Sequence, residues 1–124
     1  MTIVYHEPPS ELSQETRDIH RALTSLVEEL EAVAWYRQRI DVTQNDELRA
    51  IVEHNMNEEI EHASMSLEWL RRNFPMFDEI LRLYLFTSVP ITEVEEHAGE
   101  AGGEAKEGPK ERAAGNLGIG SLKS

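Results

Sequence analysis

Two long amphipathic stretches, joined by a short polar break, limit what this chain can fold into. Residues 13–40 contain no glycine or proline, and their apolar side chains recur at the spacing of one helix face. Residues 46–72 repeat this pattern after a break of loop composition at residues 41–46. Ser10 or Ser13 can cap the first stretch, and Asn45 can cap the second. The pattern predicts an antiparallel two-helix hairpin and therefore an all-α fold.

The segments that flank this hairpin differ from it in composition. Pro75 suits the first turn of a short third helix that ends before Pro90. Beyond it the chain is mostly Glu, Gly, Ala and Lys, which is typical of a flexible acidic linker. We therefore expect four segments: an N-terminal lead at 1–12, a helical domain at 13–92, a linker at 93–116 and a terminal peptide at 117–124.

Charge and composition exclude several classes of function. The formal net charge of −12 argues against nucleic-acid binding, which requires clustered lysine and arginine. Because there are no cysteines, any metal must be held by carboxylate and imidazole groups. No apolar run approaches the ~18 residues of a membrane span, and residues 1–9 lack the basic and apolar regions of a signal peptide. We therefore expect a cytoplasmic protein with no membrane partner.

Glu59 and His62 form the pattern with the clearest chemical meaning. They are three residues apart, so their side chains share one helix face and can reach the same metal. Glu29 lies eleven residues before Ile40 and Glu59 lies twelve after Glu47, which places the two carboxylates at similar height in a hairpin. Charged groups inside a helical core are costly unless a partner such as a divalent metal compensates them. The alternative is a solvated Glu-rich face with a surface histidine.

Two-fold symmetry would complete a metal site from this half set. Two hairpins supply four glutamates and two histidines, which is the ligand set of di-iron carboxylate proteins built on four-helix bundles. Carboxylate and imidazole ligands suit iron and manganese. The sequence therefore predicts a half-bundle that dimerises into a four-helix bundle and binds a pair of metal ions, iron or manganese. With iron, open coordination positions on Fe(II) would admit dioxygen and allow oxidation to Fe(III).

A second group of candidate ligands lies on another face of the second helix. His54, Glu58 and Glu61 are spaced for one helix face and can hold a peripheral metal. An ordinary solvated face explains them equally well. The isolated histidines of the chain, His6, His20 and His97, receive no role.

Three segments of the chain resemble the encapsulated ferritins, two-helix members of the ferritin-like group that travel inside encapsulin shells. These segments are Val27–Tyr36, His54–Ala63 and Ser66–Asn73, and the resemblance extends over about residues 10–92. It implies a ferroxidase centre at a dimer interface, with ligands from both subunits, and a larger ring of dimers. The implied ligands are Glu29, Glu59 and His62, with Tyr36 beside the centre.

The same resemblance implies a site where metal enters ahead of the centre. Its carboxylates correspond to Glu28 and Glu31, with Trp35 nearby. The family usually has an aspartate just before the tryptophan, and this chain has Ala34 there. The departure affects the expected route of metal entry and leaves the main ligand set unchanged.

The C-terminal peptide resembles the encapsulin-targeting peptide, in which aliphatic residues surround a Gly-Ser-Leu and a basic residue follows. The aliphatic side chains are those of Leu117, Ile119 and Leu122. The resemblance implies a protein inside an encapsulin nanocompartment, whose shell would store the oxidised iron. Two alternatives to a ferroxidase remain: a cargo that binds or delivers iron without turnover, and a structural cargo helix with no metal role.

Overall fold

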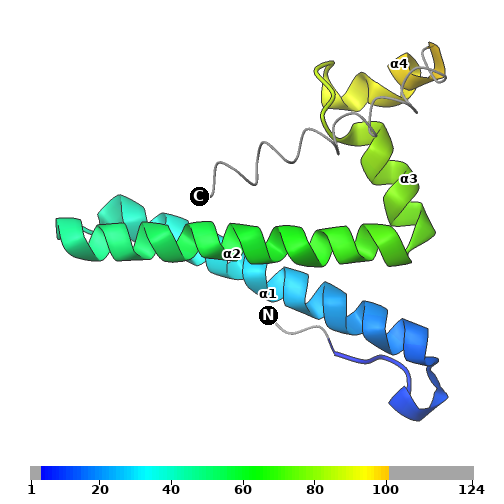
Figure 1. Ribbon diagram of the computed structural model, residues 1–124, viewed down its shortest axis with the longest axis horizontal. Helices are drawn as coiled ribbons and strands as arrows, with labels where there is room; N and C mark the ends of the chain where they lie inside the picture. The colour runs from blue at the N-terminus through cyan, green and yellow to red at the C-terminus, as the bar shows by residue number, and fades with distance from the viewer. Residues whose placement is uncertain (1–3, 101–124) are drawn as a thin grey trace. The chain divides into compact units, whose positions relative to one another are not determined.

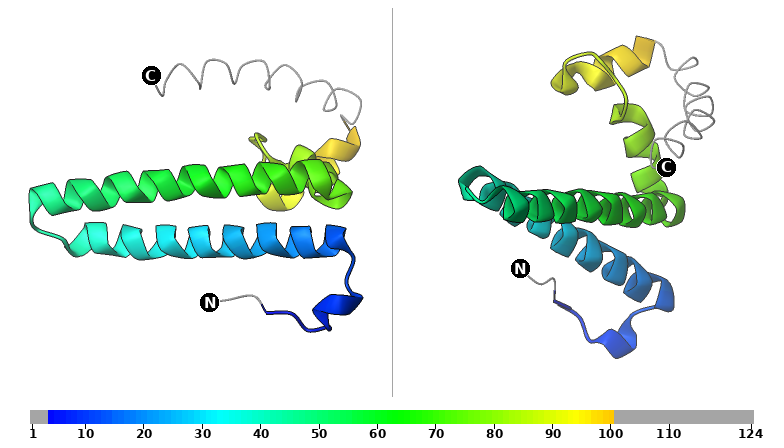
Figure 2. Two further views of the ribbon diagram at one scale, coloured as in Figure 1. Left: turned by 60° about the horizontal axis from the view of Figure 1, so that its bottom comes forward. Right: turned by 60° about the vertical axis from the view of Figure 1, so that its left-hand side comes forward.

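Two long antiparallel helices dominate the computed structural model, which describes residues 4–100 of the chain. Helices α1 (Gln14–Val42) and α2 (Asp46–Asn73) lie side by side, joined by a three-residue loop at 43–45 (Figure 1; Figure 2, left). Within residues 4–100 all regular structure is helical, and no helix there is long and apolar enough to cross a bilayer. The predicted all-α half-bundle is confirmed.

Side-chain caps fix where both long helices begin. The Ser13 hydroxyl accepts a hydrogen bond of 3.1 Å from the backbone N–H of Thr16. Asn45 Oδ1 accepts one of 2.9 Å from the backbone N–H of Leu48. Each cap satisfies an amide that has no partner inside its helix. Of the two candidate serines for α1, the structure therefore uses Ser13 rather than Ser10, and Asn45 caps α2 as predicted.

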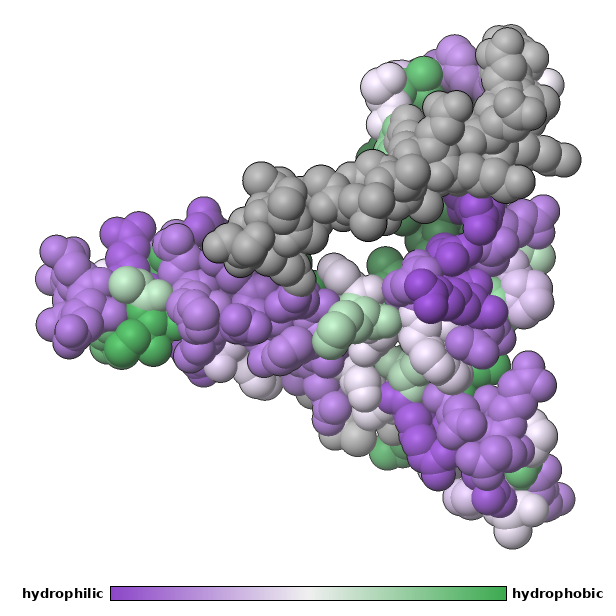
Figure 3. All heavy atoms as spheres, in the orientation of Figure 1, coloured by the Kyte–Doolittle hydropathy of each residue, from purple (hydrophilic) through white to green (hydrophobic). Residues whose placement is uncertain are grey.

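The hairpin encloses very little of its own surface. In the described hairpin only Ile40, Ala63 and Leu70 are buried hydrophobic residues. Large apolar side chains stay exposed along α2, at Leu48, Ile51, Ile60, Met65 and Trp69. Figure 3 shows the hydrophilic side chains that dominate one face, with small hydrophobic patches between them. Helices normally bury their apolar stripe against a second layer, and one hairpin supplies only part of that layer.

The N-terminal lead is held against α1. Its residues Pro9–Glu11 form a short 3₁₀ turn, η1. The Arg17 guanidinium on α1 donates from Nε to the Pro9 carbonyl at 2.9 Å. The Tyr5 ring stacks on His20, with 4.2 Å between the ring centroids. His20, to which the sequence assigned no role, therefore takes part in packing the lead.

A second unit of the chain begins at Met76. Helix α3 (Pro75–Tyr84) leads into it and starts at the predicted proline. Phe86, just after this helix, has a φ of 62°, a left-handed conformation that a phenylalanine rarely adopts. A 3₁₀ turn, η2 (Ile91–Glu93), follows Pro90 and leads into helix α4 (Val94–Glu100).

Helix α4 occupies the start of the segment whose composition predicts a flexible linker. Val94 is buried, which gives this short helix an apolar anchor. Glu95 and Glu96 lie in its first turn, where carboxylates interact favourably with the helix dipole. The structure thus differs from the linker prediction over residues 94–100. The rest of the predicted linker and the terminal peptide at 117–124 lie outside the described residues, so those boundaries stay predictions.

Candidate metal centre

Glu59 and His62 form an accessible pair of possible metal ligands on α2. Their three-residue spacing brings His62 Nδ1 to 3.8 Å from Glu59 Oε2. The Glu59 side chain is 26% exposed and the His62 side chain 44%, so both can be reached from outside the hairpin. A divalent metal bound at about 2.1 Å from each atom would hold them at most about 4.2 Å apart. The pair therefore already has the spacing of two ligands on one ion.

Glu29 is held toward α2 from the opposite helix. The Ser66 hydroxyl donates a hydrogen bond of 3.3 Å to Glu29 Oε2, and this contact is partly buried. Ser66 follows His62 by four residues, so the two lie on the same side of α2. The hairpin therefore directs Glu29 toward the stretch of α2 that carries the Glu59–His62 pair.

The contact of Glu29 with Ser66 lies further from the hairpin turn than Glu59 does. Side chains on a helix lean toward the N-terminus of that helix. In an antiparallel hairpin Glu29 therefore leans away from the turn, whereas residues of α2 lean toward it. The prediction that Glu29 and Glu59 lie at similar height counted residues along the backbone only, and it did not include this lean of the side chains. The sequence pattern assigned Ser66 no role.

One chain does not gather its candidate ligands at a single point. Within residues 4–100, no three histidine, aspartate or glutamate side chains form a group that could hold a metal ion. A single chain presents the Glu59–His62 pair and, separately, the Glu29 carboxylate. The donor atoms suit iron chemically, because carboxylate and imidazole bind it well. None of the three side chains is buried.

Tyr36 lies two turns after Glu29 on the same side of α1. It is half-buried, and the guanidinium carbon of Arg39 lies 5.4 Å from the centroid of its ring. A guanidinium at this distance attracts the face of an aromatic ring. Arg39 was not among the predicted site residues, although its i,i+3 spacing from Tyr36 is the signal that would have found it.

The carboxylates of the predicted point of metal entry differ in exposure. Glu28 is exposed on α1, whereas Glu31 is half-buried one turn further on. Trp35 leaves about half of its surface in solvent. The helix therefore presents a carboxylate, a second carboxylate and an indole ring in succession, from Glu28 toward the hairpin turn.

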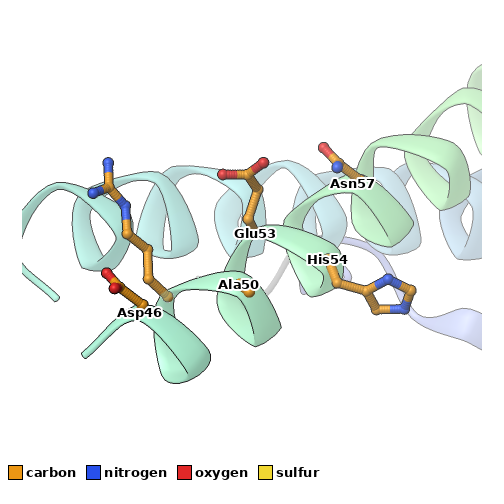
Figure 4. Close-up of a pocket in the computed structure, with 6 residues that line it drawn as sticks. Asp46, Ala50, Glu53, His54 and Asn57 are labelled. Atoms are coloured by element: carbon orange, nitrogen blue, oxygen red, sulfur yellow. The ribbon is translucent and has the colours of Figure 1, made fainter. Parts of the chain in front are cut away.

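The predicted peripheral group is more open to solvent. His54 Nε2 lies 3.6 Å from Glu58 Oε1, and both residues are exposed, whereas Glu61 is half-buried. His54 also borders an open depression of about 400 Å³ on α2, together with Asp46, Arg49, Ala50, Glu53 and Asn57 (Figure 4). In Figure 4 the His54 ring points to a different side from Glu53 and Asn57. The groups around this depression therefore do not converge on one ligand.

Glu68 is an acidic residue of α2 that is already paired with cations. Its carboxylate accepts a hydrogen bond of 2.8 Å from Arg71 Nε and one of 2.6 Å from Arg72 Nε. The Arg71 hydrogen bond is the largest effect on its acidity. The Arg72 hydrogen bond and the positive charges of both arginines act in the same direction. Together these effects outweigh the cost of burying the carboxylate and lower the pKa of Glu68 to about 2. This carboxylate is therefore not a candidate metal ligand.

Comparisons with known proteins give a consistent result. The sequence model of the EncFtn-like family matches residues 4–88. The chain is 55% identical over 118 residues to a ferritin-like protein of Thermotoga maritima, covering 95% of this chain and 96% of the relative. It is 54% identical over 121 residues to an encapsulated ferritin-like protein of Rhodospirillum rubrum, covering 95% of this chain and 86% of that relative.

Two further similarities concern a cargo protein and a solved structure. Over 47 residues the chain is 43% identical to the encapsulin nanocompartment cargo protein EncC of Myxococcus xanthus, covering 38% of this chain and 36% of that one. The crystal structure of protein ne0167 from Nitrosomonas europaea matches with a TM-score of 0.69 and 59% identity. That match covers 70% of this chain and 96% of the crystallised one.

Proposed function

Because the chain belongs to the EncFtn-like family, we propose that it is a ferroxidase, which oxidises Fe(II) to Fe(III) with dioxygen. The observation that carries this proposal is the Glu59–His62 pair, whose nitrogen and oxygen lie 3.8 Å apart and are accessible from outside the hairpin. Glu29, which Ser66 holds toward the same helix, adds a third donor.

The proposed centre is shared between two copies of the chain. One chain lacks a complete group of ligands within residues 4–100, whereas two copies offer four carboxylates and two imidazoles from Glu29, Glu59 and His62. The exposed apolar side chains of α2 support this arrangement, because Met65 lies three residues after His62 and is exposed. Burying such side chains against a second hairpin stabilises a dimer by about 25 cal/mol for each Å² of apolar surface.

The ligand residues would bind the substrate iron and balance its charge. Two Fe(II) ions give up two electrons, and one dioxygen with two protons takes them up to form hydrogen peroxide. Carboxylates favour the more highly charged Fe(III) product because they neutralise part of its charge. The imidazole of His62 would supply a nitrogen ligand. Tyr36 lies on the same side of α1 as Glu29, and the Arg39 guanidinium lies over one face of its ring.

We assign the outer carboxylates to the supply of iron. Glu28 and Glu31, with Trp35, would receive Fe(II) ahead of the centre, and the exposure of Glu28 and Trp35 supports that role. His54, Glu58 and Glu61 would bind a peripheral cation, which the 3.6 Å approach of His54 and Glu58 supports. The net charge of −12 attracts cations to the whole surface.

We further propose that the protein is cargo of an encapsulin shell. The names of two relatives support this assignment, since one is called encapsulated and the other an encapsulin nanocompartment cargo protein. Leu117, Ile119 and Leu122, which lie outside the described residues, would bind the inner wall of the shell. Oxidised iron would then be stored by the shell, because open assemblies of hairpins do not enclose a mineral.

Anaerobic loading with Fe(II), followed by separation by mass and exposure to oxygen, tests the proposal. Dimers and larger species should bind iron, and should consume oxygen while Fe(III) absorbance rises. Monomers that each bind and oxidise two iron ions would contradict a shared centre. Iron binding without oxygen consumption would instead favour the alternative, a non-catalytic cargo that binds or delivers iron.

A matched pair of variants makes the test specific to the proposed ligands. Glu59→Ala removes a donor of the central pair, whereas Glu53→Ala removes an exposed carboxylate on the same helix. Both change the net charge equally, so general electrostatic attraction falls by the same amount. Only Glu59→Ala should abolish iron oxidation. Equal losses in the two variants would show that net charge rather than a defined site captures the iron.

A further inference from the structure

Two serines on α2 use their hydroxyl groups in different ways. Ser64 donates to the carbonyl oxygen of Ile60 in its own helix at 2.8 Å, which is common for a serine inside a helix. Ser66 instead donates across the hairpin to Glu29 Oε2 at 3.3 Å, in a partly buried position. Ser66 therefore connects a proposed iron ligand on α1 to the helix that carries the other two.

We propose that Ser66 is a positioning residue, which orients the Glu29 carboxylate for Fe(II) binding. This inference rests on the proposed function of the same centre. An ionised carboxylate has two oxygens with about four acceptor positions. The Ser66 hydroxyl occupies one position on Oε2, so Oε1 and the remaining lone pairs stay available to a metal. Partners of this kind fix the geometry of ligands and commonly affect metal affinity by 10–100-fold, to an order of magnitude.

Two effects of this hydrogen bond oppose each other. A donor withdraws charge from the carboxylate and so weakens it as a ligand. However, a glutamate side chain has several rotatable bonds, and ordering it before the metal arrives removes an entropic cost from binding. A neutral hydroxyl at 3.3 Å, longer than the roughly 2.5–3.0 Å usual for a hydrogen bond between two oxygens, withdraws little charge. Orientation should therefore dominate, and Ser66 should strengthen metal binding.

Binding of Co(II), which oxygen does not oxidise under mild conditions, measures this effect without turnover. Ser66→Ala should weaken Co(II) binding by about tenfold, the lower end of the range for such partners, and should change the visible absorption of the bound ion. Alanine is the best helix former, so the substitution leaves α2 intact. Ser66→Thr keeps a hydroxyl and should restore both the affinity and the spectrum. Ser64→Ala, the matched control, should behave as the wild type.

A double-mutant cycle separates the hydrogen bond from its effect on metal. In metal-free protein, the loss of melting temperature caused by Ser66→Ala should be smaller when Glu29 is already alanine. Additive losses would overturn the inference, because the two side chains would then not interact. It would also be overturned if Ser66→Ala bound Co(II) like the wild type, if Ser66→Thr failed to restore binding, or if Ser64→Ala caused the same loss.

These outcomes differ from those that would refute the proposed function. A wild type that binds Co(II) and Fe(II) but consumes no oxygen is not a ferroxidase, although the role of Ser66 would stand. A wild type that oxidises Fe(II) while Ser66→Ala leaves the Co(II) affinity and spectrum unchanged is a ferroxidase without a positioning serine. Failure of the wild type to bind either ion would refute both.

Discussion

Glu59 and His62 lie one turn apart on α2, with 3.8 Å between the carboxylate oxygen Oε2 and the imidazole nitrogen Nδ1. Both side chains are partly exposed in the single chain. A hairpin of two helices has only a narrow interior, and its candidate ligands therefore lie at an edge that another copy can cover. At this place the pair cannot form a fully enclosed metal site within one chain, but it is suited to a site that two copies of the chain share.

Replacing either member of this pair should remove the proposed activity. Glu59→Ala or His62→Ala takes away a proposed direct iron ligand, so the loss should exceed the 10–100-fold typical of outer partners and reach about 100-fold or more. Fe(III) absorbance and oxygen uptake measure the rate. The fold should survive, because neither residue is buried. Full activity in both variants would exclude this pair from the centre.

The surface beside His62 should decide whether the chain dimerises. Met65 is 61% exposed in the single chain, and Met65→Lys would place a charge in the proposed interface. Native mass spectrometry should show a shift to monomers, together with a fall of about tenfold or more in iron oxidation. Val42→Lys is the control, since Val42 is 76% exposed and lies at the end of α1 beside the turn. Dimers that persist in Met65→Lys would place the interface elsewhere.

The sequence predicted the hairpin well because its signals are local. The spacing of apolar residues and the polar residues Ser13 and Asn45 determine where the helices begin, and neither depends on distant contacts. The contact between Ser66 and Glu29 was not predicted, because it depends on the register of two helices and on the lean of their side chains. Helix α4 was missed for a related reason, since the burial of Val94 is a tertiary effect that composition does not reveal.

Leu70 should be the most sensitive position of the hairpin core. It is fully enclosed, whereas most apolar residues of α2 are only partly covered. Leu70→Ala leaves a cavity and should lower the free energy of unfolding by about 3 kcal/mol. Val42→Ala, at an exposed position, should change it by no more than about 0.5 kcal/mol. Thermal unfolding followed by circular dichroism compares the two, and equal effects would mean that the interior of the hairpin contributes little.

Acid should weaken the C-terminal half of α2 through Glu68. Hydrogen bonds from Arg71 and Arg72 lower the pKa of its carboxyl in the folded chain to about 2, from an ordinary value of 4.5. The stabilisation is therefore complete above about pH 4.5 and is lost as the pH falls toward 2. The side chain is 42% exposed, so solvent screening limits the effect to about 1 kcal/mol.

Glu68→Gln provides the comparison for this pH dependence. Above about pH 5 the wild type should be more stable than the variant by a constant amount, because the carboxylate is fully ionised in both the folded and the unfolded chain. Between pH 4.5 and 2 the difference should shrink. Urea unfolding across this range measures it. A difference that grew on acidification would mean that the arginines do not stabilise the ionised carboxylate.

The terminal peptide should control packaging without affecting iron chemistry. Replacing Leu117, Ile119 and Leu122 together by alanine removes the apolar side chains that would enter pockets on the shell wall. Co-expression with an encapsulin shell protein, followed by purification of the shells, should then recover at least tenfold less of this variant than of the wild type. Each buried leucine or isoleucine contributes about 1.5–3 kcal/mol, so losing three weakens binding to the shell by far more than tenfold.

Two controls accompany the triple variant. Asn116→Ala should be packaged normally, and the free triple variant should oxidise Fe(II) at the wild-type rate. Normal packaging of the triple variant would mean that the shell recognises the helical domain instead.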